Sequence, residues 1–199
     1  MANQDPKADN LGSFVWTVAN LISLFRILLV PVFVAAVLGR RQGLALLLFF
    51  IAVMSDLLDG LAARAWHQRS KLGTFLDPAG DKLLMAASYV VLTLPSSARA
   101  NALPVWLTGL VFARDLLIVS GAAYGHFRLR LKTFLPSLLG KFTTGFQVGT
   151  VFWVLFFNYR GTTPGILSWF YGATAAMTVA SGVDYFLKGL KILRARRPA

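Results

Sequence analysis

The stretch between Asp56 and Asp81 decides how this chain is interpreted. It reads Asp56-Leu-Leu-Asp59-Gly60-Leu-Ala-Ala63-Arg64, then eight further residues, then Gly73-Thr-Phe-Leu-Asp77-Pro-Ala-Gly-Asp81. The whole chain has eight acidic residues, all of them aspartate, and four of the eight fall in this stretch. Because the flanking sequence is strongly apolar, four carboxylates here need a physical reason.

The spacing of these aspartates predicts a metal site between two helices. Asp56 and Asp59 are three residues apart and Asp77 and Asp81 are four apart, so each pair shares one helix face. Two helices meeting on these faces would form a cluster that is stable only with bound cations or shared protons. All-oxygen ligation suits Mg²⁺, Mn²⁺ or Ca²⁺, whereas zinc is disfavoured because the chain has no cysteine and only two histidines.

Small residues and one cation accompany the carboxylates. Gly60, Ala63 and Arg64 continue the first face, and Gly73 lies four residues before Asp77. The small side chains leave room for a ligand beside the metal, and the guanidinium of Arg64 is suited to phosphate.

The whole pattern, Asp-x2-Asp-Gly-x2-Ala-Arg-x8-Gly-x3-Asp-x3-Asp, resembles the signature of the CDP-alcohol phosphatidyltransferases at every specified position. The resemblance implies an enzyme that transfers a phosphatidyl group from CDP-diacylglycerol to an alcohol and releases CMP. It also implies a homodimer and Mg²⁺ or Mn²⁺, with two ions bound. The implied metal ligands are Asp56, Asp59 and Asp77, with Asp81 as the base near the acceptor hydroxyl or a further ligand. The implied nucleotide-side positions are Gly60, Ala63, Arg64 and Gly73.

Composition predicts an integral membrane protein of one domain, residues 1–199. The 199 residues are 56% hydrophobic and only 14% charged, and the mean hydropathy is +0.63. The net charge of +12 does not indicate nucleic acid, because the basic residues flank apolar runs instead of forming a soluble basic face. Anionic headgroups and inner-leaflet orientation explain them. Residues 1–13 form a polar N-terminal segment and 188–199 a basic cytoplasmic tail.

Apolar runs predict an all-α protein with six membrane-spanning helices, at roughly 19–38, 44–65, 79–95, 104–125, 142–158 and 165–187. The motif loop would run from Trp66 to Pro78, where Asp77 has the alternative role of capping the third span. Twelve Lys and Arg residues lie in the segments on one side and four on the other, which places both termini and the motif loop in the cytoplasm. We therefore expect a polar, metal-binding cavity that opens to the cytoplasm.

Other polar residues at membrane depth are further candidates. Asn20, Ser23 and Arg26 share a face of the first span, where they contact nucleotide or phosphate or are ordinary interfacial residues. Arg114 and Asp115 lie near the middle of the fourth span, as a structural pair or as a substrate contact.

Basic groups supply the remaining candidates. Lys141 begins the fifth span and is a candidate for binding an anionic acceptor, together with Arg26 and Arg114. Asp184 and Lys188, four residues apart, predict a surface ion pair.

The stretches 20–33 and 77–84 resemble the branch that contains the phosphatidylglycerol-phosphate synthases and cardiolipin synthases. Within it, Arg114-Asp115 and the later Gly-Lys-x-Thr-Thr resemble the one-domain cardiolipin synthases, which implies phosphatidylglycerol as the favoured acceptor. Glycerol-3-phosphate is the alternative acceptor. From another class, an ion-coupled membrane transporter also uses carboxylates in the membrane, but it would more often have an inverted repeat.

Overall fold

A computed structural model of the chain describes residues 18–66, 73–95, 100–127 and 138–195, with side chains described for 24–55, 80–95, 100–121, 123 and 138–190. Within these residues the chain forms helices and no strands, which confirms the all-α prediction. The helices are α1 (Val18–Leu38), α2 (Gln42–Trp66), α3 (Gly73–Thr93), α4 (Val105–Phe127), α5 (Leu138–Arg160) and α6 (Ile166–Ala195).

Five helices follow the predicted apolar spans, but the third begins earlier than predicted. Helix α3 begins at Gly73 and not at residue 79. Its first turns contain glycine, threonine, aspartate and proline, so an apolar count misses them. Asp77 therefore lies inside the helix, one turn after Gly73, and the alternative that it caps the third span is wrong. The loop predicted to reach Pro78 is shorter for the same reason.

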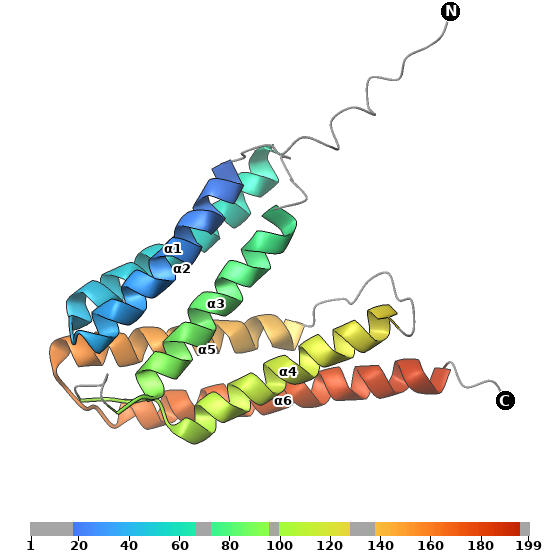
Figure 1. Cartoon of the computed structure of the whole chain (residues 1–199). Helices are drawn as coiled ribbons and strands as arrows, with labels where there is room; N and C mark the ends of the chain where they lie inside the picture. The colour runs from blue at the N-terminus through green and yellow to red at the C-terminus, as the bar shows by residue number, and fades with distance from the viewer. Residues whose placement is uncertain (1–17, 67–72, 96–99, 128–137, 196–199) are drawn as a thin grey trace, which may run out of the picture.

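Consecutive helices run in opposite directions (Figure 1). The turns that follow α1, α3 and α5 lie at one end of the bundle. The end of α2, the start of α3, the end of α4 and the start of α5 lie at the other end. This alternation groups the connecting segments into the two sets on which the count of basic residues was based.

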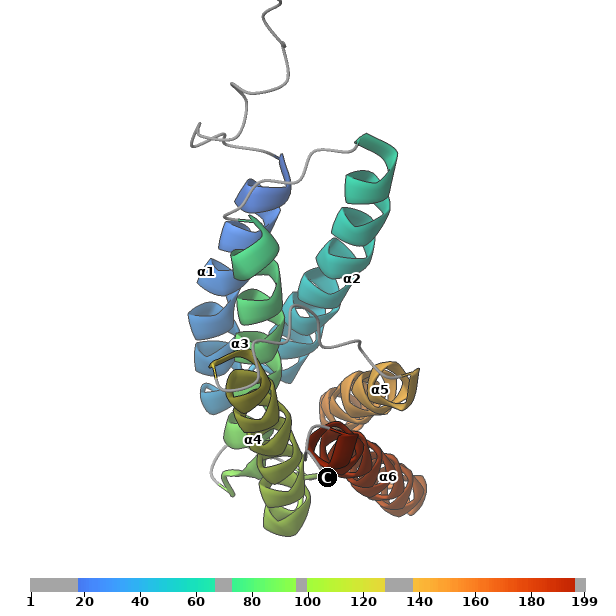
Figure 2. The ribbon, with the colours of Figure 1, turned by 90° about the vertical axis from the view of Figure 1, so that its right-hand side faces the viewer.

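The helices pack in a closed order around the bundle. Helix α1 packs against both α2 and α3, α2 packs against α5, α5 against α6, and α6 against α4, whereas α4 makes only a light contact with α3. Figure 2 shows α1, α3 and α4 on one side and α2, α5 and α6 on the other. The apolar core includes Phe33 of α1 and Phe49 of α2, whose ring centroids are 6.1 Å apart.

A row of buried hydroxyl groups joins α5 to α6. The hydroxyl oxygens of Thr150 and Thr174 are 2.6 Å apart, and the Thr143 hydroxyl lies 2.9 Å from the carbonyl oxygen of Met177. Thr178 is also fully buried and donates to the Thr174 carbonyl. Small polar residues of this kind let two helices approach closely where lipid surrounds them.

The surface of the bundle is apolar and several of its buried residues are polar. Leu116, Val105 and Trp169 are among many large hydrophobic side chains that are exposed, whereas Arg26 and Asn158 are fully buried. This distribution is typical of a chain surrounded by lipid. In the described part of the chain, Ile166–Leu190 has the length and apolarity to cross a membrane, and Leu24–Leu38 and Gln42–Ser55 are shorter apolar stretches.

Helices α1 and α5 end in the same hydrogen-bonded turn. After α5, the Thr162 amide donates to the carbonyl of Phe157 over 3.1 Å, and Gly161 adopts a φ of +67°. After α1, the Arg41 amide donates to the Ala36 carbonyl over 2.9 Å, and Arg40 adopts a φ of 55°. Both turns are Schellman motifs, which favour glycine at the left-handed position.

Candidate active site

Both halves of the acidic motif lie on helices. Asp56 and Asp59 lie near the end of α2, and Asp77 and Asp81 lie in the first turns of α3. The end of α2 and the start of α3 are at the same end of the bundle, and both helices pack against α1 (Figures 1 and 2). The helix geometry therefore keeps each aspartate pair on one face.

Most side chains of the predicted site lie outside the described side chains. This holds for Asn20, Ser23, Asp56, Asp59, Gly60, Ala63, Arg64, Gly73 and Asp77. Among the described residues, no group of three or more His, Cys, Asp or Glu lies close enough to hold a metal ion. The four-carboxylate cluster therefore stays a prediction.

Asp81 is the one motif carboxylate whose surroundings are described. The Nη1 atom of Arg26, on α1, donates a hydrogen bond to Oδ1 of Asp81 in an ion pair. The Arg26 side chain is 1% exposed and the Asp81 side chain is 44% exposed. A buried guanidinium is stable only with such a partner. The pair thus ties α1 to α3 and leaves the Asp81 carboxylate accessible.

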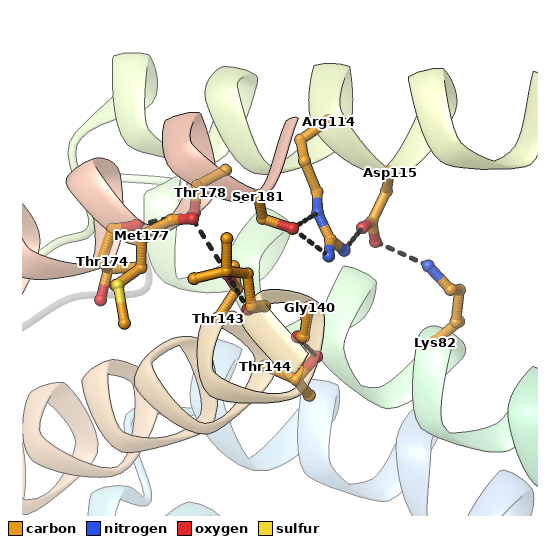
Figure 3. Close-up of polar contacts among 11 residues, drawn as sticks. Lys82, Arg114, Asp115, Gly140, Thr143, Thr144, Thr174, Met177, Thr178 and Ser181 are labelled. Atoms are coloured by element: carbon orange, nitrogen blue, oxygen red, sulfur yellow. Dashed lines mark hydrogen bonds and ion pairs between the residues drawn. The ribbon is translucent and has the colours of Figure 1, made fainter. Parts of the chain in front are cut away.

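A second charged group links α3, α4 and α6 (Figure 3). The two carboxylate oxygens of Asp115 accept one from Lys82 Nζ over 3.0 Å and the other from Arg114 Nη1 over 2.7 Å. Arg114 also donates to the hydroxyl of Ser181 over 2.8 Å, and its guanidinium carbon lies 5.7 Å from the ring centre of Tyr185. Arg114 is thereby held on three sides.

This network answers part of the question about Arg114 and Asp115, because they pair with each other. It also contains Lys82, which sequence reasoning did not select as a site residue. The available signal was its position directly after Asp81, but its partner Asp115 is 33 residues away in the chain.

A cavity of about 270 Å³ lies beside this network. It is bounded by α3 and α4, with Gln147 of α5 also in its lining. The Nε2 atom of Gln147 is buried and has no hydrogen-bond partner in the protein. Lys82 and Asp115 also line the cavity, so its wall carries charge at one place and is otherwise largely apolar.

Lys141 lies elsewhere. It is exposed and lines a different cavity of about 330 Å³, together with Phe142, Phe146 and Phe170. None of the charged residues described above lines that cavity. Near the end of α6, Lys188 Nζ lies 2.6 Å from Asp184 Oδ2, which confirms the predicted surface pair.

The fold and the motif define a class of protein that comparison with known sequences identifies. Residues 16–182 match the family model of the CDP-alcohol phosphatidyltransferases. The chain belongs to this family, as the motif predicted. The match disfavours the transporter alternative.

Relatives within the family carry two names. The chain is 33% identical to a human cardiolipin synthase (CMP-forming), over 90% of this chain and 64% of the human protein. It is 34% identical to a CDP-diacylglycerol–glycerol-3-phosphate 3-phosphatidyltransferase of Aquifex aeolicus, over 88% of this chain and 97% of that protein. A cardiolipin synthase of Streptomyces coelicolor is 38% identical over 56% of this chain and 54% of its own length. The chain thus spans just under two thirds of the human relative, and the relatives differ in the acceptor that their names imply.

Proposed function

We propose that this chain transfers the phosphatidyl group of CDP-diacylglycerol to an alcohol, with release of CMP, in phospholipid synthesis. The observation that carries the proposal is the complete family motif, divided between two helices that both pack against α1. The accessible Asp81 carboxylate supports it, because a base must be reachable by the acceptor hydroxyl.

The residues of the motif fit a divalent metal. Asp56, Asp59, Asp77 and Asp81 offer only oxygen donors, which Mg²⁺ and Mn²⁺ prefer, and the chain has no thiol that would select a softer ion. Two ions would be held by these four carboxylates. When bound, the ions would neutralise the diphosphate and stabilise the phosphate of the leaving CMP.

The reaction would be one displacement at phosphorus. The acceptor oxygen forms a bond to the phosphorus that carries the diacylglycerol, and the bond from that phosphorus to CMP breaks. CMP leaves with the bonding electron pair, and Asp81 takes the hydroxyl proton. The ion pair with Arg26 holds the Asp81 carboxylate in one orientation on α3. On the nucleotide side we propose contacts from Asn20, Ser23, Gly60, Ala63, Arg64 and Gly73.

The proposed acceptor is phosphatidylglycerol, so that the product is cardiolipin. Arg114 supports this choice, because its guanidinium is already engaged by Asp115 and Ser181. A phosphomonoester such as glycerol-3-phosphate carries more negative charge and would need more cations at the site than a phosphodiester lipid. Of the three acceptor candidates, Arg26 would act beside Asp81, Arg114 through Asp115, and Lys141 from the start of α5.

The proposal includes a location. The apolar surface of the bundle supports six helices crossing the membrane, with the motif end facing the cytoplasm and two copies forming a homodimer. In that arrangement a water-soluble nucleotide and a lipid reach the same carboxylates.

The experiment is an acceptor panel with purified full-length protein. CDP-diacylglycerol and Mg²⁺ or Mn²⁺ are supplied with phosphatidylglycerol or with glycerol-3-phosphate, and released CMP and the lipid product are measured. We expect CMP release with phosphatidylglycerol and cardiolipin as the product. Faster turnover of glycerol-3-phosphate would overturn the acceptor assignment. No CMP release with either acceptor, from folded protein, would overturn the proposed function.

A further inference from the structure

Helices α3 and α4 are joined at two places and separate between them. Near the turn that connects them, the hydroxyl oxygens of Thr93 and Thr108 are 2.6 Å apart. Eleven residues earlier on α3, roughly 16 Å along the axis, Lys82 reaches Asp115 over 3.0 Å. The cavity of about 270 Å³ lies along this part of the two helices. We call it the α3–α4 crevice.

The crevice is lined by one face of each helix. Its residues on α3 are Lys82, Met85, Ala86 and Tyr89, and those on α4 are Val111, Phe112, Asp115, Leu116 and Val119. Both sets follow helical spacing. Apart from Lys82, Asp115 and the Tyr89 hydroxyl, these side chains are apolar, and Leu116 and Phe112 are also exposed on the outer surface. The crevice therefore opens towards the apolar surface of the bundle.

The volume limits what the crevice can hold. Pockets for whole small molecules measure about 300–1,000 Å³. The crevice, at about 270 Å³, suits part of a larger molecule, such as the first segment of one acyl chain.

Gln147 gives the crevice an unused hydrogen-bond donor. This residue is 5% exposed and lines the crevice, and its Nε2 atom has no partner in the protein. Leaving a buried donor unpaired is costly, so a ligand oxygen would be bound favourably there. An ester carbonyl at the top of an acyl chain supplies such an acceptor.

The charges at the crevice select the headgroup. Lys82 and Arg114 are cations and Asp115 is an anion, which leaves one positive charge. Arg114 is 9% exposed, whereas Lys82 is 52% exposed, so Lys82 is the cation that a ligand reaches. One positive charge matches the single negative charge of a phosphodiester.

We propose that the α3–α4 crevice binds an anionic phosphodiester lipid. Lys82 contacts the phosphate, the first segment of one acyl chain lies between α3 and α4, and Gln147 donates to an ester carbonyl. Because Lys82 directly follows Asp81, a free hydroxyl on the headgroup would lie near the proposed base. That acceptor role rests on the proposed function, whereas lipid binding in the crevice does not.

The test is photocrosslinking of the full-length protein in nanodiscs. The probe is phosphatidylglycerol with a diazirine in the acyl chain near the ester, and labelled peptides are mapped by mass spectrometry. We expect labels on residues 82–89 and 111–119. A phosphatidylcholine probe with the same chain should label these residues more weakly, because its headgroup carries no net charge. Labelling confined to other helices, or equal labelling by both probes, would overturn the proposal.

Variants with matched controls sharpen the test. Ala86→Phe fills the crevice and should lower labelling about tenfold, whereas Ala113→Phe adds the same bulk to an exposed α4 position outside the crevice and should not. Ala86→Leu replaces Ala86→Phe if the larger side chain prevents folding. Lys82→Gln should remove about tenfold of the preference for phosphatidylglycerol, whereas Lys188→Gln, at another exposed lysine, should leave it intact. Unchanged labelling in both crevice variants would contradict the proposal.

CMP release is measured separately with the same variants. Crevice labelling without CMP release in the wild type would leave the lipid site standing and overturn the proposed function. CMP release without crevice labelling would do the reverse.

Discussion

Two interfaces of this bundle use polar residues in different ways. Between α5 and α6 the polar groups are neutral hydroxyls, as in the pair Thr150 and Thr174, and these are fully buried and bonded to each other. Between α3 and α4 the link at Lys82 and Asp115 is charged and partly exposed, and it lies beside a cavity with an unpaired amide donor.

The difference separates packing from function. A neutral hydroxyl pair has both of its partners within the fold, so it can hold helices together without any ligand. Charge and an unsatisfied donor in a membrane protein are costly when they serve packing alone, and they indicate a binding site. The residues that should affect activity therefore lie on the α3 side of the bundle, and those on the α5–α6 side should affect stability.

The largest effect is expected from Asp81→Asn on α3. Loss of a general base should lower the rate of CMP release about 10²–10⁴-fold. Because Arg26 then keeps a buried charge without its carboxylate, the melting temperature should fall as well. The double variant Arg26→Gln/Asp81→Asn should recover melting temperature but not turnover. Turnover that recovers along with melting would show that Asp81 is structural.

Asp115→Ala should give the next largest effect, on stability. It leaves the guanidinium of Arg114 buried without a carboxylate, which costs about 3–5 kcal/mol for a fully buried pair. Asp115 is 31% exposed, so we expect about 2–3 kcal/mol, measured by unfolding in detergent. The control is Lys188→Gln, which removes an exposed i,i+4 pair and should cost at most about 0.5 kcal/mol. Equal losses in the two variants would mean that the Arg114 network is an ordinary surface feature.

The turn between α5 and α6 offers a third test. Gly161→Ala places a side chain at a φ of +67° and should destabilise the protein by about 1–2 kcal/mol without changing turnover per folded molecule. No atom lies within 4 Å of the added carbon, so the loss would come from the backbone and not from a clash. Gly165→Ala, with open space and a φ outside the left-handed region, is the matched control and should be near neutral. A similar loss at Gly165 would contradict this account of the turn.

Thr150→Val should give the smallest effect. The hydroxyl of Thr174 retains the Phe146 carbonyl oxygen, 3.3 Å away, as an acceptor, so the variant leaves no orphaned group. Interhelical hydrogen bonds of this kind contribute about 0.6 kcal/mol in membrane proteins. We expect a loss of that order and wild-type turnover. Reduced turnover at unchanged stability would place α5–α6 in the site and remove the contrast between the two interfaces.

The sequence predicts most of the fold because long apolar runs favour helices and charged turns separate them. It also predicts the family, because the motif depends on local spacing alone. The start of α3 was mispredicted, since the residues from Gly73 to Pro78 are too polar and too small for an apolar run. Local pairs such as Asp184 and Lys188 follow directly from helical register.

Long-range partners could not be predicted in the same way. Arg26 and Asp81 are 55 residues apart, and their pairing depends on how α1 packs against α3. Lys82 is an ordinary basic residue in the sequence, and only the separation of α3 from α4 gives it a cavity. Gln147 looks like any polar residue at the start of a helix, and its role depends on which helices surround it. The register of one helix does not determine its neighbours.

The dependence of CMP release on divalent metal tests the central claim most directly. Wild-type protein is given CDP-diacylglycerol and phosphatidylglycerol, Mg²⁺ or Mn²⁺ is titrated in, and Asp56→Asn is measured alongside. The account predicts no release with chelator, saturable release as the ion is added, and little release from Asp56→Asn at any ion concentration. Equal release with chelator and with metal, or wild-type release from Asp56→Asn, would contradict it.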